Sequence, residues 1–338
     1  MKIWYDVTNT PQVHFLLALK KGIAEKKEHK YAISCRDFSE TIPLLERAGE
    51  KNILIIGAHS GGNLFNKALS LLKRFYDVYS IAPNFDISIS CGSESAVWTA
   101  LIKRKKSIAF GDNDLAKQWT YGKFASYAFF PDAIPERILS KQGISVNKLY
   151  RYPGYKEDIY IADYEPDVSF VETLPFDRYV VVRPENLQAN YIRNNNVKSI
   201  TPELLKKLTN RGYNVLYLPR YQIDYEYGKD LKGVYTPSTP VNGLDACYFS
   251  DAVLTGAGTF AREASCLGVP SFSFFAGKRL LAVDRSMIDK KMMMFSRDVD
   301  SLVEAVTKSE RKEVSLSRSK EVKKVVITKL IEVIEGWS

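Results

Sequence analysis

The chain has 338 residues, of which 45% are hydrophobic and 26% charged, and it carries a net charge of +9. This length fits two α/β domains better than one core, and the composition is ordinary for a globular protein. No apolar run approaches the ~20 residues that a membrane span requires. The four cysteines contain no CxxC pair, which argues against a metal site or a disulfide framework.

The positive charge is concentrated in the first half. Residues 1–160 contain 23 Lys/Arg against 16 Asp/Glu, a net +7, so the remainder carries +2. This excess predicts an anionic partner, either a phosphorylated or lipid-linked acceptor or a peripheral contact with an anionic membrane. Charge that serves solubility alone is the alternative. No RNA- or DNA-binding motif is present, so we expect no nucleic-acid partner.

Along the first 155 residues, strand-like apolar segments alternate with amphipathic helices. The first segment reads as a strand and not as a signal peptide, so we expect a cytoplasmic protein, with any membrane contact at the inner face. The expected strands are 2–7, 31–35, 52–56, 86–90, 107–110 and 127–130. The expected helices are 11–27, 39–48, 64–79 and one that opens within 91–95. Such alternation predicts a parallel sheet covered on both faces.

The turn-rich segment 151–178 interrupts this rhythm, and we place a domain boundary there. An N-terminal domain of residues 1–155 would precede a C-terminal domain of residues 160–316. The second half repeats the alternation, with strands 179–182, 214–218, 233–235, 252–254 and 271–274 and helices 202–211, 241–249, 259–267, 298–307 and 317–335. We therefore expect two Rossmann-like α/β domains, with ligands bound at the carboxyl ends of the strands and in a cleft between the domains.

The stretch 251–263 is the strongest candidate for a ligand site. It reads as a short strand, a turn of small residues and a helix that opens at Thr259. The small residues would let the backbone approach a ligand, and the unpaired N–H groups at the helix start would attract a diphosphate. Glu263, one turn further, could accept bonds from sugar hydroxyls. The alternative is an ordinary strand-to-helix turn with Thr259 as N-cap. The residues assigned to this site are Thr255, Gly256, Ala257, Gly258, Thr259 and Glu263.

Three cations would complete an anion pocket around this turn. Arg183 and Arg220 each follow a strand of the second half, and Lys278 follows the strand after the helix of Glu263. Guanidinium groups bind phosphate oxygens in a fixed geometry, which suits them to this role. Surface salt bridges are the alternative.

The first half offers two candidate bases and an acceptor side. His14 follows the first strand and Asp112 follows the fifth, where either could deprotonate a hydroxyl. Packing of the helix start is the alternative for His14. The acceptor side would be formed by His59, Gly61, Gly62, Asn113 and Asp114. Asp114 could instead cap the helix that follows it.

Several motifs resemble those of an uncharacterised prokaryotic family of GT-B-like proteins. They are Trp4-Tyr5-Asp6, residues 11–14, Arg36-Asp37-Phe38, residues 59–62, Asn113-Asp114, Arg151-Tyr152-Pro153-Gly154, Val182-Arg183-Pro184-Glu185, Leu218-Pro219-Arg220-Tyr221, residues 256–263 and Gly277-Lys278. They cover nearly the whole chain, which is identified on them as a member of that family.

More distantly, the layout is similar to nucleotide-sugar 2-epimerases and to murein-type N-acetylglucosaminyltransferases. This resemblance implies that residues 256–259 hold the diphosphate, that Glu263 binds the ribose and that His14 lies at the catalytic or acceptor position. It also implies that the last helix returns to the N-terminal domain. The loop after the first strand departs from the epimerases, because it carries Asn9-Thr10-Pro11-Gln12 in place of their Arg-Pro-Glu.

The resemblance therefore implies a GT-B-type glycosyltransferase that uses a nucleotide-diphosphate sugar as substrate, with neither a cofactor nor a bound metal. Two alternatives stay open. One is a nucleotide-sugar 2-epimerase, and the other is a non-catalytic protein of the same fold that binds a nucleotide or a phospholipid.

Overall fold

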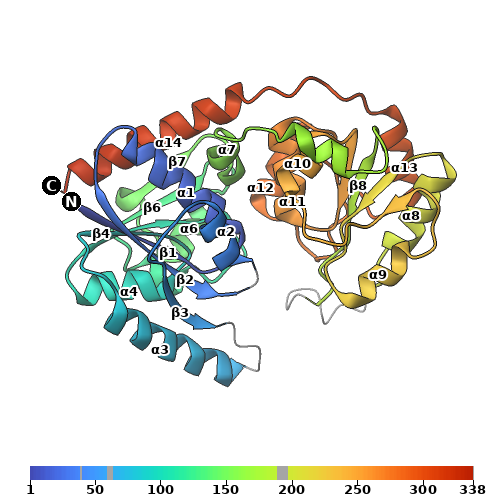
Figure 1. Ribbon diagram of the computed structural model, residues 1–338. Coiled ribbons are helices and arrows are strands. Elements are labelled where there is room, and N and C mark those ends of the chain that lie inside the picture. Colours follow the sequence, from blue (N-terminus) through green and yellow to red (C-terminus); the bar gives the residue numbers. More distant parts are fainter. Residues whose placement is uncertain (39, 59–63, 189–196, 338) are drawn as a thin grey trace. The chain divides into compact units, whose positions relative to one another are not determined.

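The computed structural model describes residues 1–38, 40–58, 64–188 and 197–337. The chain forms two compact units (Figure 1). Unit 1 contains residues 1–160 and 320–338, and unit 2 contains residues 161–319. Each unit is built on its own parallel sheet with helices against it, as the alternation of the sequence predicts.

The sheet of unit 1 has seven strands in the order β3-β2-β1-β4-β5-β6-β7. They are β1 Lys2–Val7, β2 Lys30–Asp37, β3 Leu54–Ala58, β4 Ile87–Cys91, β5 Lys106–Phe110, β6 Tyr127–Pro131 and β7 Leu149–Tyr152. The helices are α1 Pro11–Ala24, α2 Thr41–Arg47, α3 Leu64–Ile81, α4 Glu94–Ile102, α5 Trp119–Gly122, α6 Glu136–Lys141 and α7 Lys156–Ile161. Every residue of the inner strand β4 is buried, including Ser88 and Ser90, as expected for an inner strand of a sheet covered on both faces.

The sheet of unit 2 has six strands in the order β10-β9-β8-β11-β12-β13. They are β8 Val180–Arg183, β9 Val215–Tyr217, β10 Val234–Tyr235, β11 Ala252–Thr255, β12 Ser271–Ser273 and β13 Met294–Phe295. The helices are α8 Thr201–Asn210, α9 Gln222–Gly228, α10 Gly243–Tyr248, α11 Gly258–Leu267, α12 Ala282–Asp289 and α13 Val299–Lys308. The core of this unit joins the inner strands to α8 and α13 through buried Val, Leu and Phe side chains.

The last helix, α14 Ser317–Glu335, returns to unit 1, as expected. Two glycines make room for it. A Cβ on Gly22 of α1 would lie 2.7 Å from the side chain of Ile327, and a Cβ on Gly154 would lie 2.6 Å from that of Val322. The glycines in α1 and in the turn after β7 therefore allow α14 to pack closely against unit 1.

Some elements were not expected from the sequence. The elements without a counterpart in the expected list are the edge strands β7 and β13 and the helices α5, α6, α7, α9 and α12. Three of the four residues of β7 are only half-buried, and β13 has two residues, one of them exposed, so neither strand has the apolar signal of an inner strand. Among the described residues, no helix is both long and apolar enough to cross a bilayer.

Candidate functional site

The turn after β11 starts its helix one residue earlier than expected. α11 begins at Gly258, and Thr259 lies within its first turn, so the assignment of Thr259 as N-cap is wrong. The buried Thr255 sets this geometry, because its Oγ1 accepts a hydrogen bond of 2.9 Å from the N–H of Ala257. The hydroxyl of Thr259 instead contacts Nη2 of Arg262 at 3.3 Å.

Gly256 is required by packing. A Cβ at this position would lie 2.5 Å from Cγ and 2.6 Å from Cα of Glu185, in the segment that follows β8. The N–H of Gly256 donates to the carbonyl oxygen of Arg183 at 3.0 Å. A Cβ on Gly258 would meet only Nη1 of Arg262, at 3.2 Å. The two glycines of the turn therefore differ, and Gly256 accommodates the neighbouring chain whatever it does toward a ligand.

Arg183 lies directly beside this turn. It is the last residue of β8, and it pairs in register with Thr255 of β11. Its guanidinium carbon lies 5.2 Å from the centre of the Phe260 ring. Its Nε is buried and has no hydrogen-bond partner among the described residues. An arginine with an unsatisfied buried donor next to a helix N-terminus is suited to receive an anion.

The charges of Arg220 and Glu263 act on Arg183. Burial and the positive charge of Arg220 lower the pKa of Arg183 to about 10, while Glu263 opposes this shift. These three residues and the turn belong to unit 2, and their joint role toward a ligand stays a prediction. We call Arg183, Arg220, Glu263 and the turn 255–259 the anion cluster.

Lys278, the third predicted cation, is exposed on unit 2. Its role toward a ligand stays a prediction.

A buried ion pair supports the anion cluster and was not foreseen. Nη1 of Arg262 donates to Oδ1 of Asp284 at 2.9 Å, and both side chains are buried. This pair ties the first turn of α11 to α12. The sequence shows Arg262 next to Glu263, but it does not identify Asp284 as the partner of Arg262, because Asp284 lies on α12, a helix that was not expected.

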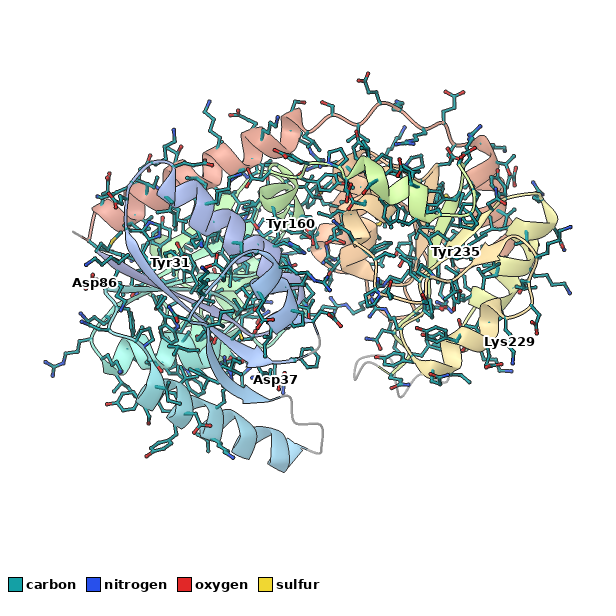
Figure 2. All side chains as sticks on the ribbon, viewed as in Figure 1. Tyr31, Asp37, Asp86, Tyr160, Lys229 and Tyr235 are labelled. Atoms are coloured by element: carbon teal, nitrogen blue, oxygen red, sulfur yellow. The ribbon has the colours of Figure 1, made fainter. Side chains whose placement is uncertain are left out.

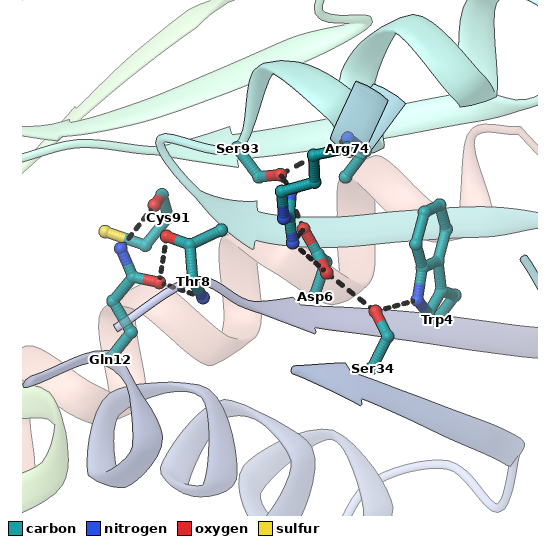
Figure 3. A network of polar contacts seen from close by, with 9 residues as sticks. Trp4, Asp6, Thr8, Gln12, Ser34, Arg74, Cys91 and Ser93 are labelled. Carbon is teal, nitrogen blue, oxygen red and sulfur yellow. Dashed lines mark hydrogen bonds and ion pairs between the residues drawn. The ribbon is translucent and has the colours of Figure 1, made fainter. Parts of the chain in front are cut away.

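In unit 1, Asp6 at the end of β1 belongs to a closed network of hydrogen bonds (Figure 3). The carboxylate is fully buried and accepts from the hydroxyls of Ser34 and Ser93. It also accepts from Nη2 of Arg74, at 3.0 and 3.1 Å. The carboxylate of Asp6 therefore joins β1 to β2, α3 and the start of α4, and all of its acceptor capacity is in use.

His14 lies in the first turn of α1, with its ring centre 6.1 Å from that of Tyr160. More than a third of the residue is exposed, yet the surrounding protein lowers the pKa of the imidazole through desolvation. The neutral form, which is the one able to accept a proton, is therefore favoured near pH 7.

Asp112 is half-buried after β5, and its Oδ2 accepts from Nζ of the buried Lys156 at 2.6 Å. To act as a base, this carboxylate would have to accept a proton from the acceptor while it is ion-paired with Lys156. The sequence did not indicate this partner. Next to it, Oδ1 of Asn113 accepts from the N–H of Leu115 at 2.9 Å, whereas Asp114 is buried.

Three other predicted residues, His59, Gly61 and Gly62, lie outside the described residues. In the part of the chain that is described, no group of three or more His, Cys, Asp or Glu side chains is arranged to hold a metal ion.

The chain is similar to known proteins over nearly its whole length. The uncharacterized protein MJ0665 of Methanocaldococcus jannaschii is 23% identical over 325 residues, which cover 90% of this chain and 91% of that protein. Among solved structures, the UDP-GlcNAc 2-epimerase of Neisseria meningitidis bound to UDP-GlcNAc has a TM-score of 0.73 at 11% identity, covering 98% of this chain and 100% of that one. The glycotransferase of kitacinnamycin has a TM-score of 0.63 at 10% identity, covering 99% and 98%.

These likenesses show the fold, which is the GT-B-like arrangement of two parallel-sheet α/β domains found in nucleotide-sugar enzymes. Over residues 1–335 the sequence also matches one family model. The chain therefore belongs to the family described as protein of unknown function DUF354.

Proposed function

We propose that this chain is a GT-B-type glycosyltransferase that binds a nucleotide-diphosphate sugar on unit 2. The observation that carries the proposal concerns the guanidinium of Arg183. Its buried Nε lacks a hydrogen-bond partner among the described residues, and the positive charge of Arg220 repels it. Two guanidinium groups held together cost free energy unless an anion joins them. A diphosphate at the start of α11 would supply that anion.

The anion cluster would act on the leaving group. During transfer, the acceptor oxygen forms a bond to the anomeric carbon, and the bond from that carbon to the diphosphate oxygen breaks. Negative charge then grows on the diphosphate, where Arg183 and Arg220 would stabilise it. Glu263 would accept hydrogen bonds from the ribose hydroxyls, and Lys278 would add a third positive group.

The acceptor would be bound by unit 1, where Asn113 and Asp114 follow β5. His14 would take the proton of the acceptor hydroxyl, because its lowered pKa keeps the imidazole neutral. Asp112 is the second candidate base, but its ion pair with Lys156 favours the charged and hydrogen-bonded state of the carboxylate. The excess positive charge of the first half supports a phosphorylated or lipid-linked acceptor.

The second candidate function is that of a nucleotide-sugar 2-epimerase. Its support is the full-length likeness to the Neisseria enzyme, whose structure contains UDP-GlcNAc. The loop after β1 argues against it. The side chain of Gln12 is fixed there by Nε2, which donates to the carbonyl of Cys91 at 2.7 Å, and by Oε1, which accepts from the N–H of Thr8 at 2.8 Å. A glutamine held in this way supplies neither the acid nor the base that epimerisation needs.

Calorimetry with uridine, guanosine and cytidine diphosphates, and with their sugars, tests the proposal. We expect one nucleotide to bind the wild type, and Glu263→Gln to weaken its binding roughly tenfold, the effect of losing charged hydrogen bonds. Thermal unfolding of the wild type and of this variant without nucleotide is the second measurement. A loss of stability with unchanged nucleotide affinity would contradict the role of Glu263.

Product analysis separates the two functions. Each nucleotide sugar that binds is incubated without an acceptor and then with candidate phosphorylated or lipid-linked acceptors. Epimerisation proceeds without an acceptor, whereas transfer requires one. Binding without turnover in either reaction would favour a non-catalytic protein of this fold.

A further inference from the structure

Arg36, a motif residue that the proposed function does not use, lies at an irregular position of unit 1. It is the second-last residue of β2, just before Asp37, which is labelled at the end of that strand in Figure 2. The pairing of β2 with β3 shifts its register between Cys35 and Asp37, so Arg36 lies at the irregularity itself. Such bulges redirect a side chain and are frequent beside functional sites.

Arg36 is half-buried, and one donor of its guanidinium is enclosed by the protein. Its Nε is buried and has no hydrogen-bond partner among the described residues. Burial and the positive charge of Arg74 lower the pKa of its guanidinium, while Asp6 and Glu94 oppose the shift. A buried donor without a partner is costly, and proteins rarely keep one that has no use.

The neighbouring carboxylates are already engaged. Asp6 accepts from Arg74, Ser34 and Ser93. Glu94 accepts at Oε1 from the hydroxyl of Thr120, at 3.2 Å. The buried Nε of Arg74 also lacks a partner among the described residues. Near the carboxyl ends of β1 and β2, the Nε donors of Arg36 on β2 and of Arg74 on α3 are therefore both left without a partner among the described residues.

We propose that Arg36 anchors a second anion site, located within unit 1, for a phosphate group of the second substrate. Guanidinium binds phosphate through two parallel N–H···O bonds, which suits a donor left over beside a fully used carboxylate. Naming this phosphate as part of the acceptor rests on the proposed function. The site itself requires only unit 1.

Inorganic phosphate is the probe, and thermal unfolding at constant ionic strength is the first measurement. Arg36→Gln is compared with Arg47→Gln, which removes the same charge from an exposed position of α2 in the same unit. Both are made in an Arg183→Gln background, so that unit 2 contributes less to phosphate binding. We expect the dissociation constant for phosphate to rise roughly tenfold or more with Arg36→Gln, and to stay unchanged with Arg47→Gln.

Stability without phosphate gives the second readout. Since Arg36 contributes an unsatisfied donor and a repelled charge, its replacement by Gln should leave the thermal midpoint unchanged or raise it. A merely structural arginine would lower the midpoint when replaced. A fall in stability together with unchanged phosphate affinity overturns the proposal, and so does acetate that binds as tightly as phosphate.

Chemical labelling tests the wild-type chain directly. Phenylglyoxal modification followed by peptide mapping should label Arg36, and phosphate should protect it while Arg47 stays equally reactive. Equal labelling of Arg36 with and without phosphate overturns the proposal. If Arg36→Gln does not change phosphate affinity while UDP still binds unit 2, this site is refuted and the proposed function stands. If UDP does not bind but Arg36→Gln weakens phosphate binding, the proposed function is refuted and this site stands.

Discussion

The strands β1 and β8 hold the same place in their two sheets, but the charged residues at their carboxyl ends differ in one respect. Each lies between the second strand and the fourth strand of its sheet. At the end of β1, Asp6 is buried with all of its partners supplied by the protein. At the end of β8, Arg183 keeps a buried Nε without a partner among the described residues.

This difference separates a structural charge from a candidate ligand-binding charge. Asp6 balances Arg74 inside unit 1, so removing either one exposes the other to an apolar environment. Arg183 instead keeps a buried Nε without a partner among the described residues, so an anion bound there would stabilise the folded state. Position at the carboxyl end of a strand is common to both residues, and hydrogen-bond satisfaction distinguishes them.

The largest expected effect is on stability, at Asp6, whose hydrogen-bonding capacity is fully used. Asp6→Ala should lower the free energy of unfolding by about 3–5 kcal/mol, because it leaves the buried Arg74 without its counter-ion. Urea unfolding followed by circular dichroism measures the change. Asp132→Ala, at an exposed position of the same unit, is the control and should stay within about 0.5 kcal/mol of the wild type. If both variants lose the same free energy of unfolding, Asp6 has no special structural role, and the contrast with Arg183 is removed.

Arg183→Gln should produce the opposite pattern. Nucleoside diphosphate affinity should fall about 10- to 100-fold, since a charge-assisted contact is lost, while stability stays equal or rises. Calorimetry and thermal unfolding measure the two effects. Arg178→Gln, an exposed arginine just before β8 that pairs with Asp251, should change neither by more than a small amount. A destabilised Arg183→Gln variant with normal affinity would make Arg183 as structural as Asp6.

The two glycines after β11 sharpen the comparison within one turn. Gly256→Ala should lower the free energy of unfolding by about 1–3 kcal/mol, because the new Cβ would overlap Cα and Cγ of Glu185. Gly258→Ala meets only the end of the Arg262 side chain, so a change below about 1 kcal/mol is expected. Denaturant midpoints of the two variants, measured side by side, decide this. Equal costs would contradict a packing role specific to Gly256.

The smallest expected effect concerns pH. The pKa of His14 is lowered from 6.5, so the imidazole should stay neutral at and above pH 6.5 and lose its function as a base only in more acidic solution. If His14 is the base, kcat/KM for transfer is flat near neutrality and falls below pH 6.5, and this acid limb disappears in His14→Asn. A limb that persists in the variant assigns the titration to another group, with Asp112 as the next candidate.

Periodicity was enough to predict the inner strands and most helices. The segments around β1, β5, β8 and β11 are almost entirely buried, so their mostly apolar residues are visible in the sequence. The elements that were missed lie at sheet edges or are short helices, where partial exposure removes the signal. The same periodicity indicated an amphipathic last helix, and its return to unit 1 is confirmed by its packing beside Gly22 and Gly154.

The sequence by itself determined the two-sheet architecture and the residues that gather at the turn after β11, because alternating apolar segments and strand-end positions are local properties. Only the tertiary structure decided which of the strand-end charges are satisfied. Asp6, Asp112, Arg36 and Arg183 all occupy such positions, but their partners come from α3, α4 and α7 or are absent among the described residues. Hydrogen bonding and burial depend on residues distant in the chain, and no spacing rule within the sequence contains them.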